Sequence, residues 1–124
     1  MPTDAEIEQE IIAKKLTAPR VTPESIESAI AAEYFFTADT ATNFLAPQHE
    51  ALKLLTICVL VLRNGFTVVG TSACASPENF DAAIGQKIAR QKAIDQVWML
   101  EGYLLKAWLF DSQFNQIMPP GESL

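Results

Sequence analysis

A predicted β-hairpin near the middle of the chain constrains the fold more than any other stretch. The runs ICVLVLR and FTVVGTSAC are rich in β-branched and aliphatic residues, and Asn64-Gly65 separates them. An Asn-Gly pair between two such runs is typical of a two-residue type I′ turn, because both residues tolerate positive φ angles. Residues 56–74 therefore predict two antiparallel strands joined by a tight turn.

This turn also predicts the register of the two strands. If Arg63 lies opposite Phe66, then Val61 lies opposite Val68. Side chains alternate along a strand, so this register puts two further residues, Cys58 and Cys74, on opposite faces of the hairpin. Both faces then consist largely of apolar side chains.

Two helices are predicted before the hairpin. Thr3 and Glu6 form a capping box ahead of isoleucines at helical spacing, which predicts a helix from Asp4 to Leu16. A hydroxyl at Thr22 followed by a proline predicts the start of a second helix, which continues to Tyr34.

The segment that follows the second predicted helix is EYFFTADTATNFLAPQ, residues 33–48. Its many Thr, Ala and Phe residues give no regular period, and we expect a loop that tucks aromatic side chains inward. The alternative is a third or fourth strand within residues 34–45.

A long helical region is predicted after the hairpin. Ser76-Pro77 is typical of a helix start, with serine as the cap and proline in the first turn. Gly102 can mark a bend, so one long helix and two successive helices both fit, and Met118–Gly121 ends the helical potential. The apolar stripe consists of Phe80, Ile84, Ile88, Ile94, Val97 and Trp98.

These elements predict an α+β protein with a hairpin or small antiparallel sheet packed against N-terminal helices and a long C-terminal helix. A chain of 124 residues with 49% hydrophobic composition is of single-domain size. We expect one domain over 1–124, divided into N-terminal helices and an aromatic loop (1–50), the hairpin (51–75) and the C-terminal helix or helix pair (76–116).

An apolar hairpin needs cover on both faces, and one layer of helices covers only one of them. A second copy of the chain is the simplest second cover, so we expect a homo-oligomer. The strand within residues 34–45 is the alternative source of cover.

Charge and composition exclude several classes of protein. Fifteen acidic and nine basic side chains give a net charge of −6, which is unsuited to long nucleic acid, although a local basic pocket could still hold a small anion. No apolar run is long enough for a membrane span, and the acidic opening MPTDAEIEQE is unlike a secretory signal. We therefore expect a cytoplasmic protein, with both cysteines reduced and no metal site.

Several motifs resemble a family of small proteins from tailed phages and prophages. They are LLTICVLVLRNGFTVVG, SACASPENFDAAIGQKIARQKAI and LEGYLLK, with EYFFTADTA upstream. The family is similar to the Thoeris anti-defence proteins, which sequester glycocyclic ADP-ribose signals made by bacterial TIR immune proteins. Some of those proteins also hold cyclic trinucleotides at a separate site of a hexamer. The resemblance implies a hexameric signal sponge in the host cytoplasm, with no cofactor.

A site for such a ligand needs an aromatic platform, a guanidinium, and amide or hydroxyl groups. Phe66 can stack on adenine, and Arg63 across from it can reach a phosphate. Ser76 and Asn79 lie where a helix start favours an anion. The remaining candidates are Arg90, which can serve a neighbouring copy, and Thr37, which can contact a larger cyclic nucleotide.

Each candidate also has a purely structural interpretation. Without the resemblance, Phe66 is a core residue of the hairpin, Ser76 and Asn79 are helix caps, and Thr37 is a structural loop residue. Arg63 and Arg90 are then solvated surface charges.

Catalysis has little support in the sequence. His49 is the only histidine, and it lies in a polar linker without a serine or cysteine partner, so no acid–base or nucleophilic arrangement is indicated. We therefore expect a protein that binds cyclic nucleotides without cleaving them. The alternatives are a phage accessory protein that binds and inhibits a host protein, and a structural protein of the virion.

Overall fold

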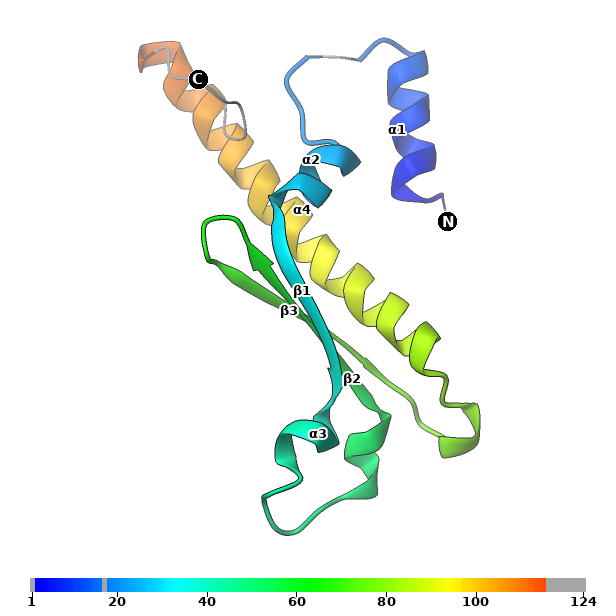
Figure 1. The fold of residues 1–124 in the computed structure, drawn as a ribbon. Coiled ribbons are helices and arrows are strands. Elements are labelled where there is room, and N and C mark those ends of the chain that lie inside the picture. Colours follow the sequence, from blue (N-terminus) through cyan, green and yellow to red (C-terminus); the bar gives the residue numbers. More distant parts are fainter. Residues whose placement is uncertain (1, 17, 116–124) are drawn as a thin grey trace. The chain divides into compact units, whose positions relative to one another are not determined.

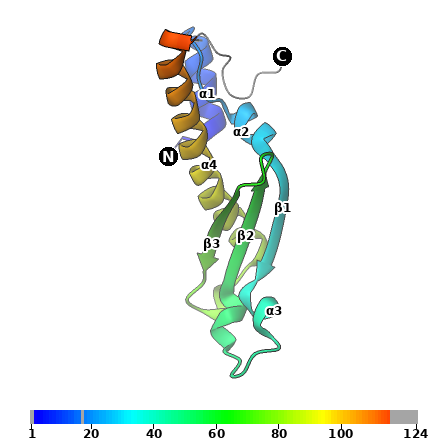
Figure 2. The ribbon, with the colours of Figure 1, turned by 90° about the vertical axis from the view of Figure 1, so that its left-hand side faces the viewer.

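The structure is a computed structural model that describes residues 2–16 and 18–115. Helices and one three-stranded antiparallel sheet of order β1-β2-β3 make up the fold, as Figures 1 and 2 show, so the α+β prediction is confirmed. The elements are α1 (Asp4–Ala13), α2 (Pro23–Ala29), β1 (Ile30–Thr37), α3 (Ala38–Thr42), the 3₁₀ turn η1 (Glu50–Leu54), β2 (Leu55–Leu62), β3 (Thr67–Ala73), the 3₁₀ turn η2 (Pro77–Asn79) and α4 (Ala82–Asn115).

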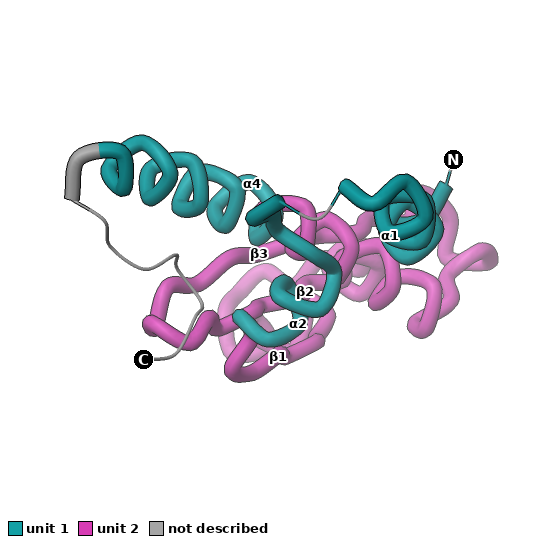
Figure 3. Tube along the Cα trace, turned by 90° about the horizontal axis from the view of Figure 1, so that it is seen from above, with its two compact units in different colours: residues 1–29, 97–124 teal, residues 30–96 magenta. Residues whose placement is uncertain are grey.

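The chain divides into two compact units, coloured separately in Figure 3. One is Ile30–Gln96, which holds the sheet and the first part of α4. The other combines α1 and α2 with α4 from Val97 onward. The expectation of one domain over 1–124 stays a prediction. In the described part of the chain, none of the helices has the length and hydropathy needed to cross a lipid bilayer.

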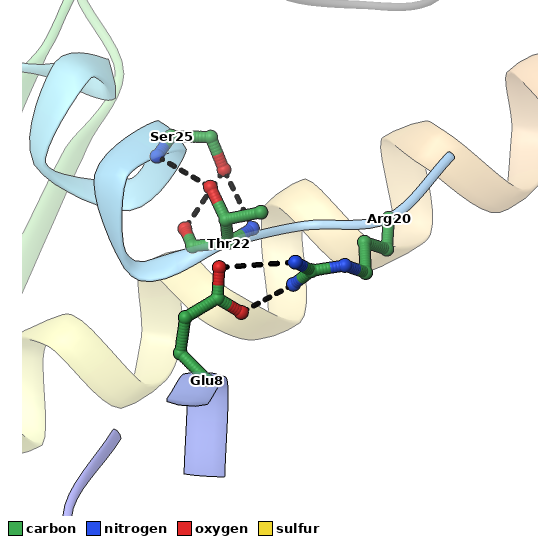
Figure 4. Close-up of polar contacts among 4 residues, drawn as sticks. All are labelled: Glu8, Arg20, Thr22 and Ser25. Carbon is green, nitrogen blue, oxygen red and sulfur yellow. Dashed lines mark hydrogen bonds and ion pairs between the residues drawn. The ribbon is translucent and has the colours of Figure 1, made fainter. Parts of the chain in front are cut away.

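Hydroxyl caps start both N-terminal helices, as the sequence predicted. The Glu6 amide donates to Thr3 Oγ1 at 3.1 Å, and the Ser25 amide donates to Thr22 Oγ1 at 3.0 Å. In addition, the Thr22 amide donates a hydrogen bond to Ser25 Oγ at 2.9 Å, so the two residues bind each other reciprocally (Figure 4). The predicted end of the first helix at Leu16 is wrong, because the helix ends at Ala13 and Lys15 takes a φ of 58°.

One ion pair ties the linker between α1 and α2 to α1. The Arg20 guanidinium meets both carboxylate oxygens of Glu8, with 3.0 Å between Nη2 and Oε2 (Figure 4). Both side chains are partly buried, and the hydrogen bond from Arg20 to Glu8 raises the pKa of Arg20 above its ordinary value. A two-pronged pair of this kind holds a linker in one orientation.

The second helix is shorter than predicted, and a strand replaces its end. The helix stops at Ala29, and Ile30–Thr37 form β1, paired antiparallel with β2. The β-branched and aromatic residues of this stretch satisfy the edge of β2 better than a third helical turn would. The alternative strand within 34–45 is therefore right for Tyr34–Thr37, while Ala38–Thr42 form α3 in place of the expected loop.

The hairpin is present, but its turn and register differ from the prediction by one residue. The Leu62 amide donates to the Phe66 carbonyl at 2.8 Å, and the Gly65 amide donates to the Leu62 carbonyl at 2.9 Å. Within the loop only Gly65 has a positive φ, of 90°, which is typical of a three-residue loop with a glycine bulge. The Phe66 amide binds Asn64 Oδ1 at 2.9 Å, which stabilises this longer loop.

The corrected register sorts even and odd residues of both strands onto separate faces. Leu60 lies opposite Val68, and Val59 opposite Val69. The inner face carries the buried Thr56, Cys58, Leu60, Leu62, Val68 and Gly70. The outer face carries Ala32, Tyr34 and Phe36 of β1, Leu55, Ile57, Val59 and Val61 of β2, and Thr67, Val69, Thr71 and Ala73 of β3.

The prediction that the two cysteines lie on opposite faces is wrong for the same reason. Cys58 is fully buried on the inner face. Cys74 follows β3, pairs through its amide with the Leu54 carbonyl at 3.1 Å, and is half-buried on the inner side. Both are free thiols.

The first part of α4 covers the inner face through a line of small residues. Gly85, Ala89 and Ala93 recur every four residues and are buried. A Cβ atom added to Gly70 would lie 2.0 Å from the Ala89 carbonyl oxygen, so the helix backbone touches the sheet. The predicted apolar stripe is therefore wrong in part, since Ile84 is 57% exposed.

The start of the C-terminal helix differs from the prediction. The helix starts at Ala82, capped by Asp81, whose Oδ1 accepts from the Ile84 amide at 3.1 Å. Ser76 makes no side-chain capping bond and precedes η2 instead. Gly102 does not interrupt α4, which is one helix, and Met118–Gly121 lie outside the described residues.

The β3 edge of the sheet carries a side-chain partner. Gln96 on α4 donates from Nε2 to the Val69 carbonyl at 2.5 Å. This bond occupies one of the outward backbone groups that an edge strand otherwise leaves open.

We expect Gly70→Ala to destabilise the protein by about 1–3 kcal/mol, the usual range for overpacking a close contact. The added methyl would push α4 off the sheet, since backbone atoms stand within 2.0 and 2.6 Å of its position. Urea unfolding followed by circular dichroism measures the change. Gly102→Ala is the matched control: nothing lies within 4 Å of its Cβ position, so it should stabilise by up to about 1 kcal/mol. Equal stability of the two variants would contradict the close packing.

Candidate functional site

The hairpin turn presents the predicted aromatic platform to solvent. Phe66 is 55% exposed, so the interpretation as a hairpin core residue is wrong. Arg63 is the first residue of the three-residue loop 63–65, which Phe66 follows, and it is exposed. A ring that is half-exposed beside a guanidinium is suited to stacking against a flat ligand.

Two other candidates, Ser76 and Asn79, lie in the connection between β3 and α4. The Asn79 amide donates to the Ser76 carbonyl at 3.1 Å, which closes η2. Asn79 is exposed, and its position is separated from α4 by Phe80 and Asp81. The expected attraction of an anion to a helix start here is weakened, because the Asp81 carboxylate already caps α4.

A pocket of about 150 Å³ lies at this end of the sheet. Its walls are the ends of β2 and β3, the connection that holds Asn79, and the first turns of α4. Typical small-molecule sites measure about 300–1,000 Å³. The pocket in one chain can therefore take a single ring or sugar, and not a whole cyclic nucleotide.

Thr37 lies near the pocket, at the end of β1. It is the Cα partner of Thr56, which in turn pairs with Ser72, so three hydroxyl residues form a row across the sheet. Thr56 and Ser72 line the pocket. The Thr37 hydroxyl donates to the Asp39 carboxylate, an interaction that also fits the structural interpretation of this residue.

Arg90 lies on α4 and pairs with β1. Its Nε donates to Glu33 Oε2 at 2.9 Å, and both side chains are partly exposed. It does not line the pocket, and its partly exposed ion pair with Glu33 fits the structural interpretation of Arg90 as a surface charge.

The structure does not bring the six candidates together within one chain. Phe66 and Arg63 lie at the turn between β2 and β3, whereas Thr37 ends β1 and Ser76 and Asn79 follow β3 at the opposite end of the sheet. The seven residues of β3 rise by about 3.4 Å each, which separates the two groups by about 20 Å. The candidates therefore form two separate groups in one chain, here called the two candidate half-sites.

The pocket also contains residues that the sequence analysis did not select. Thr56, Ser72, Cys74 and Asp81 all line it. Alternation along the strands could have placed the first two on one face, but the register error moved them apart.

Among residues 2–16 and 18–115, the acidic, histidine and cysteine side chains form no cluster of three that could hold a metal ion. His49 is exposed and precedes η1.

A comparison with known families decides the ancestry of the chain. The model of the phage protein (N4 Gp49/phage Sf6 gene 66) family matches residues 21–109. The chain belongs to this family. Neither a curated protein nor a solved structure matches it.

The part matched by the phage family contains the whole sheet and both half-sites. It starts ahead of α2 and ends within α4, so α1 lies outside it. The family assignment confirms the resemblance to phage proteins and says nothing about a ligand.

We expect the two thiols to differ in reactivity by at least tenfold. Burial raises the pKa of Cys58, and the Glu33 carboxylate adds to this effect. Because the folded pKa lies above the unfolded value of about 8.5, the folded state keeps this proton more tightly. The resulting stability is complete below pH 8.5 and is lost as the pH rises through the folded pKa.

Iodoacetamide labelling at pH 8, followed by mass spectrometry, tests this difference. Cys74 should be labelled first, and Cys58 only after unfolding. A Cys74→Ser variant should then remain unlabelled in its native state. Rapid labelling of that variant would show that Cys58 is accessible.

Proposed function

We propose that the protein is a phage anti-defence protein that binds and sequesters cyclic nucleotide immune signals. Glycocyclic ADP-ribose from TIR proteins is the first ligand, and cyclic trinucleotides are a second class. Membership of a phage protein family supports the setting. The motifs NGFTVVG and SPENFD, through their resemblance to the Thoeris anti-defence proteins, supply the ligand class.

The observation that carries the proposal is the exposed ring of Phe66 beside Arg63. The ring stacks on adenine, and the guanidinium meets the phosphates. Stacking of a base on an aromatic side chain is worth about 1–3 kcal/mol. Between residues 54 and 74, Arg63 is the one charged residue, so no neighbouring carboxylate in that stretch opposes the phosphates.

The pocket at the other end of the sheet holds the second part of the ligand. Asn79 supplies an amide at its rim, and Ser76 and Thr37 supply hydroxyls nearby. Because the half-sites of one chain lie about 20 Å apart, the turn of one copy completes the pocket of another. Arg90 faces this shared site from a neighbouring copy. There it binds a phosphate of the ligand and gives up part of its contact with Glu33.

Assembly is therefore part of the proposed function. We take the protein to be a homo-oligomer, a hexamer by the resemblance, in the cytoplasm of the bacterial host. Sequestration depends on affinity and copy number, so no catalytic group is needed and the ligand stays intact. No long nucleic acid, membrane, metal or cofactor is involved.

Titration calorimetry with glycocyclic ADP-ribose tests this proposal. Loss of the platform in Phe66→Ala should weaken binding by about 5- to 150-fold, which corresponds to about 1–3 kcal/mol. Loss of one polar contact in Asn79→Ala should weaken it by about tenfold.

Two controls of matching chemistry are available on the described surface. Phe44→Ala removes a ring that is 92% exposed in another loop, and Asn43→Ala removes an exposed amide at the end of α3. Both should bind like the unchanged chain. Wild-type affinity in both the Phe66 and the Asn79 variants would contradict the proposed site. If the ligand released by heat is chemically altered, the protein is an enzyme.

A second candidate function is inhibition of a host protein. The exposure of Phe44 and of Leu45, at 92% and 64%, favours it, because adjacent exposed apolar side chains are typical of protein contacts. In a pull-down from host lysate, a stoichiometric partner that is retained by Phe66→Ala and lost by Phe44→Ala would establish this function instead.

A further inference from the structure

We propose that two copies of this chain pack together through the outer faces of their sheets, face to face and with the strands running in opposite directions. This assigns an interface, and it holds whether or not the protein binds a nucleotide.

The burial pattern shows that the outer face lacks cover. Along β2, inner residues are buried and outer residues are only half-buried, without exception from Leu55 to Leu62. The outer residues of this central strand are nevertheless leucine, isoleucine and valine. Antiparallel sheets with one solvated face carry polar residues on that face, so this composition indicates a partner.

The row across the middle of the face illustrates the exposure. Tyr34, Val59 and Val69 are neighbours on β1, β2 and β3. Tyr34 is 58% exposed and Val69 is 46% exposed. An aromatic ring and two branched side chains in one row supply the kind of surface that interdigitates when two sheets stack.

Charge favours a second copy as the occupant. The outer face contains no acidic or basic residue, although the chain carries a net charge of −6. Two copies repel each other over a charged surface, and this repulsion is least where both surfaces are neutral. A partner selected for opposite charge would instead bind an acidic surface, which this face is not.

The size of the face is consistent with a pair of copies. Three strands about 4.8 Å apart and about seven residues long cover about 330 Å² in projection. That is as large as the apolar patches that monomers usually expose. Two such faces sum to about 660 Å² in projection, below the about 1,200 Å² at the lower end of standard specific interfaces, so this face alone forms an interface of the small, weaker class.

Charges at the two ends of the sheet set the direction. Among the charged residues of Ile30–Gln96, Arg63 lies at the turn, and Asp39, Glu50, Glu78 and Asp81 lie at the opposite end with Lys53. Packing the strands in opposite directions places each turn over the acidic end of the other copy. Packing them in the same direction would place like charges together.

Sedimentation velocity of charge variants at Val69 tests the interface. Val69→Lys and Val69→Glu should each reduce the mass of the assembly at least twofold at micromolar concentration, because either charge would be buried without a partner. A mixture of the two variants should regain the wild-type mass, since opposite charges then face each other. Recovery on mixing separates a broken interface from a misfolded chain. Gln86→Lys, exposed on α4, is the control and should leave the mass unchanged.

Cysteine cross-linking tests the direction in a Cys74→Ser background. In the proposed packing, position 61 of one copy faces position 57 of the other. Val61→Cys and Ile57→Cys chains should cross-link when mixed and not separately. Cross-linking of each variant with itself would overturn the direction. A monomeric wild-type chain, or Val69 variants that keep the wild-type mass, would overturn the interface and point to cover from elsewhere.

Discussion

The close contact between α4 and β3 is the interaction on which the rest of the structure depends. Gly70 has no side chain, and the helix backbone at Ala89 and Ala93 occupies the space where one would lie. This contact defines the inner face of the sheet and leaves the opposite face with its aliphatic side chains only half-buried. It also positions the connection before α4, so the pocket near Asn79 is a consequence of the same packing.

Local signals in the sequence predicted much of this fold. The hydroxyl caps at Thr3 and Thr22, the two strands of the hairpin and the long C-terminal helix all follow from short patterns whose physical cause lies within a few residues. The extent of β1 could not be predicted in this way, because its backbone is satisfied by β2, which is distant in the sequence. Tertiary pairing outweighed the helical spacing of Ile26, Ile30 and Tyr34.

The error in the hairpin shows how one residue changes a site. Asn64-Gly65 fits a two-residue turn and also a three-residue loop, and the Asn64 side chain selects the second by binding the Phe66 amide. A shift of one residue moves every side chain of one strand to the other face. The sequence therefore placed Phe66 and Arg63 correctly at an exposed turn, yet misassigned Thr56 and Ser72, which line the pocket.

The bond from Gln96 to the Val69 carbonyl affects how these molecules can grow into larger assemblies. A sheet with an open edge strand can pair with strands of further chains, and repeated pairing produces fibres. Here the Gln96 amide occupies a backbone acceptor of the edge strand β3, so a strand from another chain must first displace it. Growth by strand addition is thereby impeded at β3, one of the two edges of the sheet.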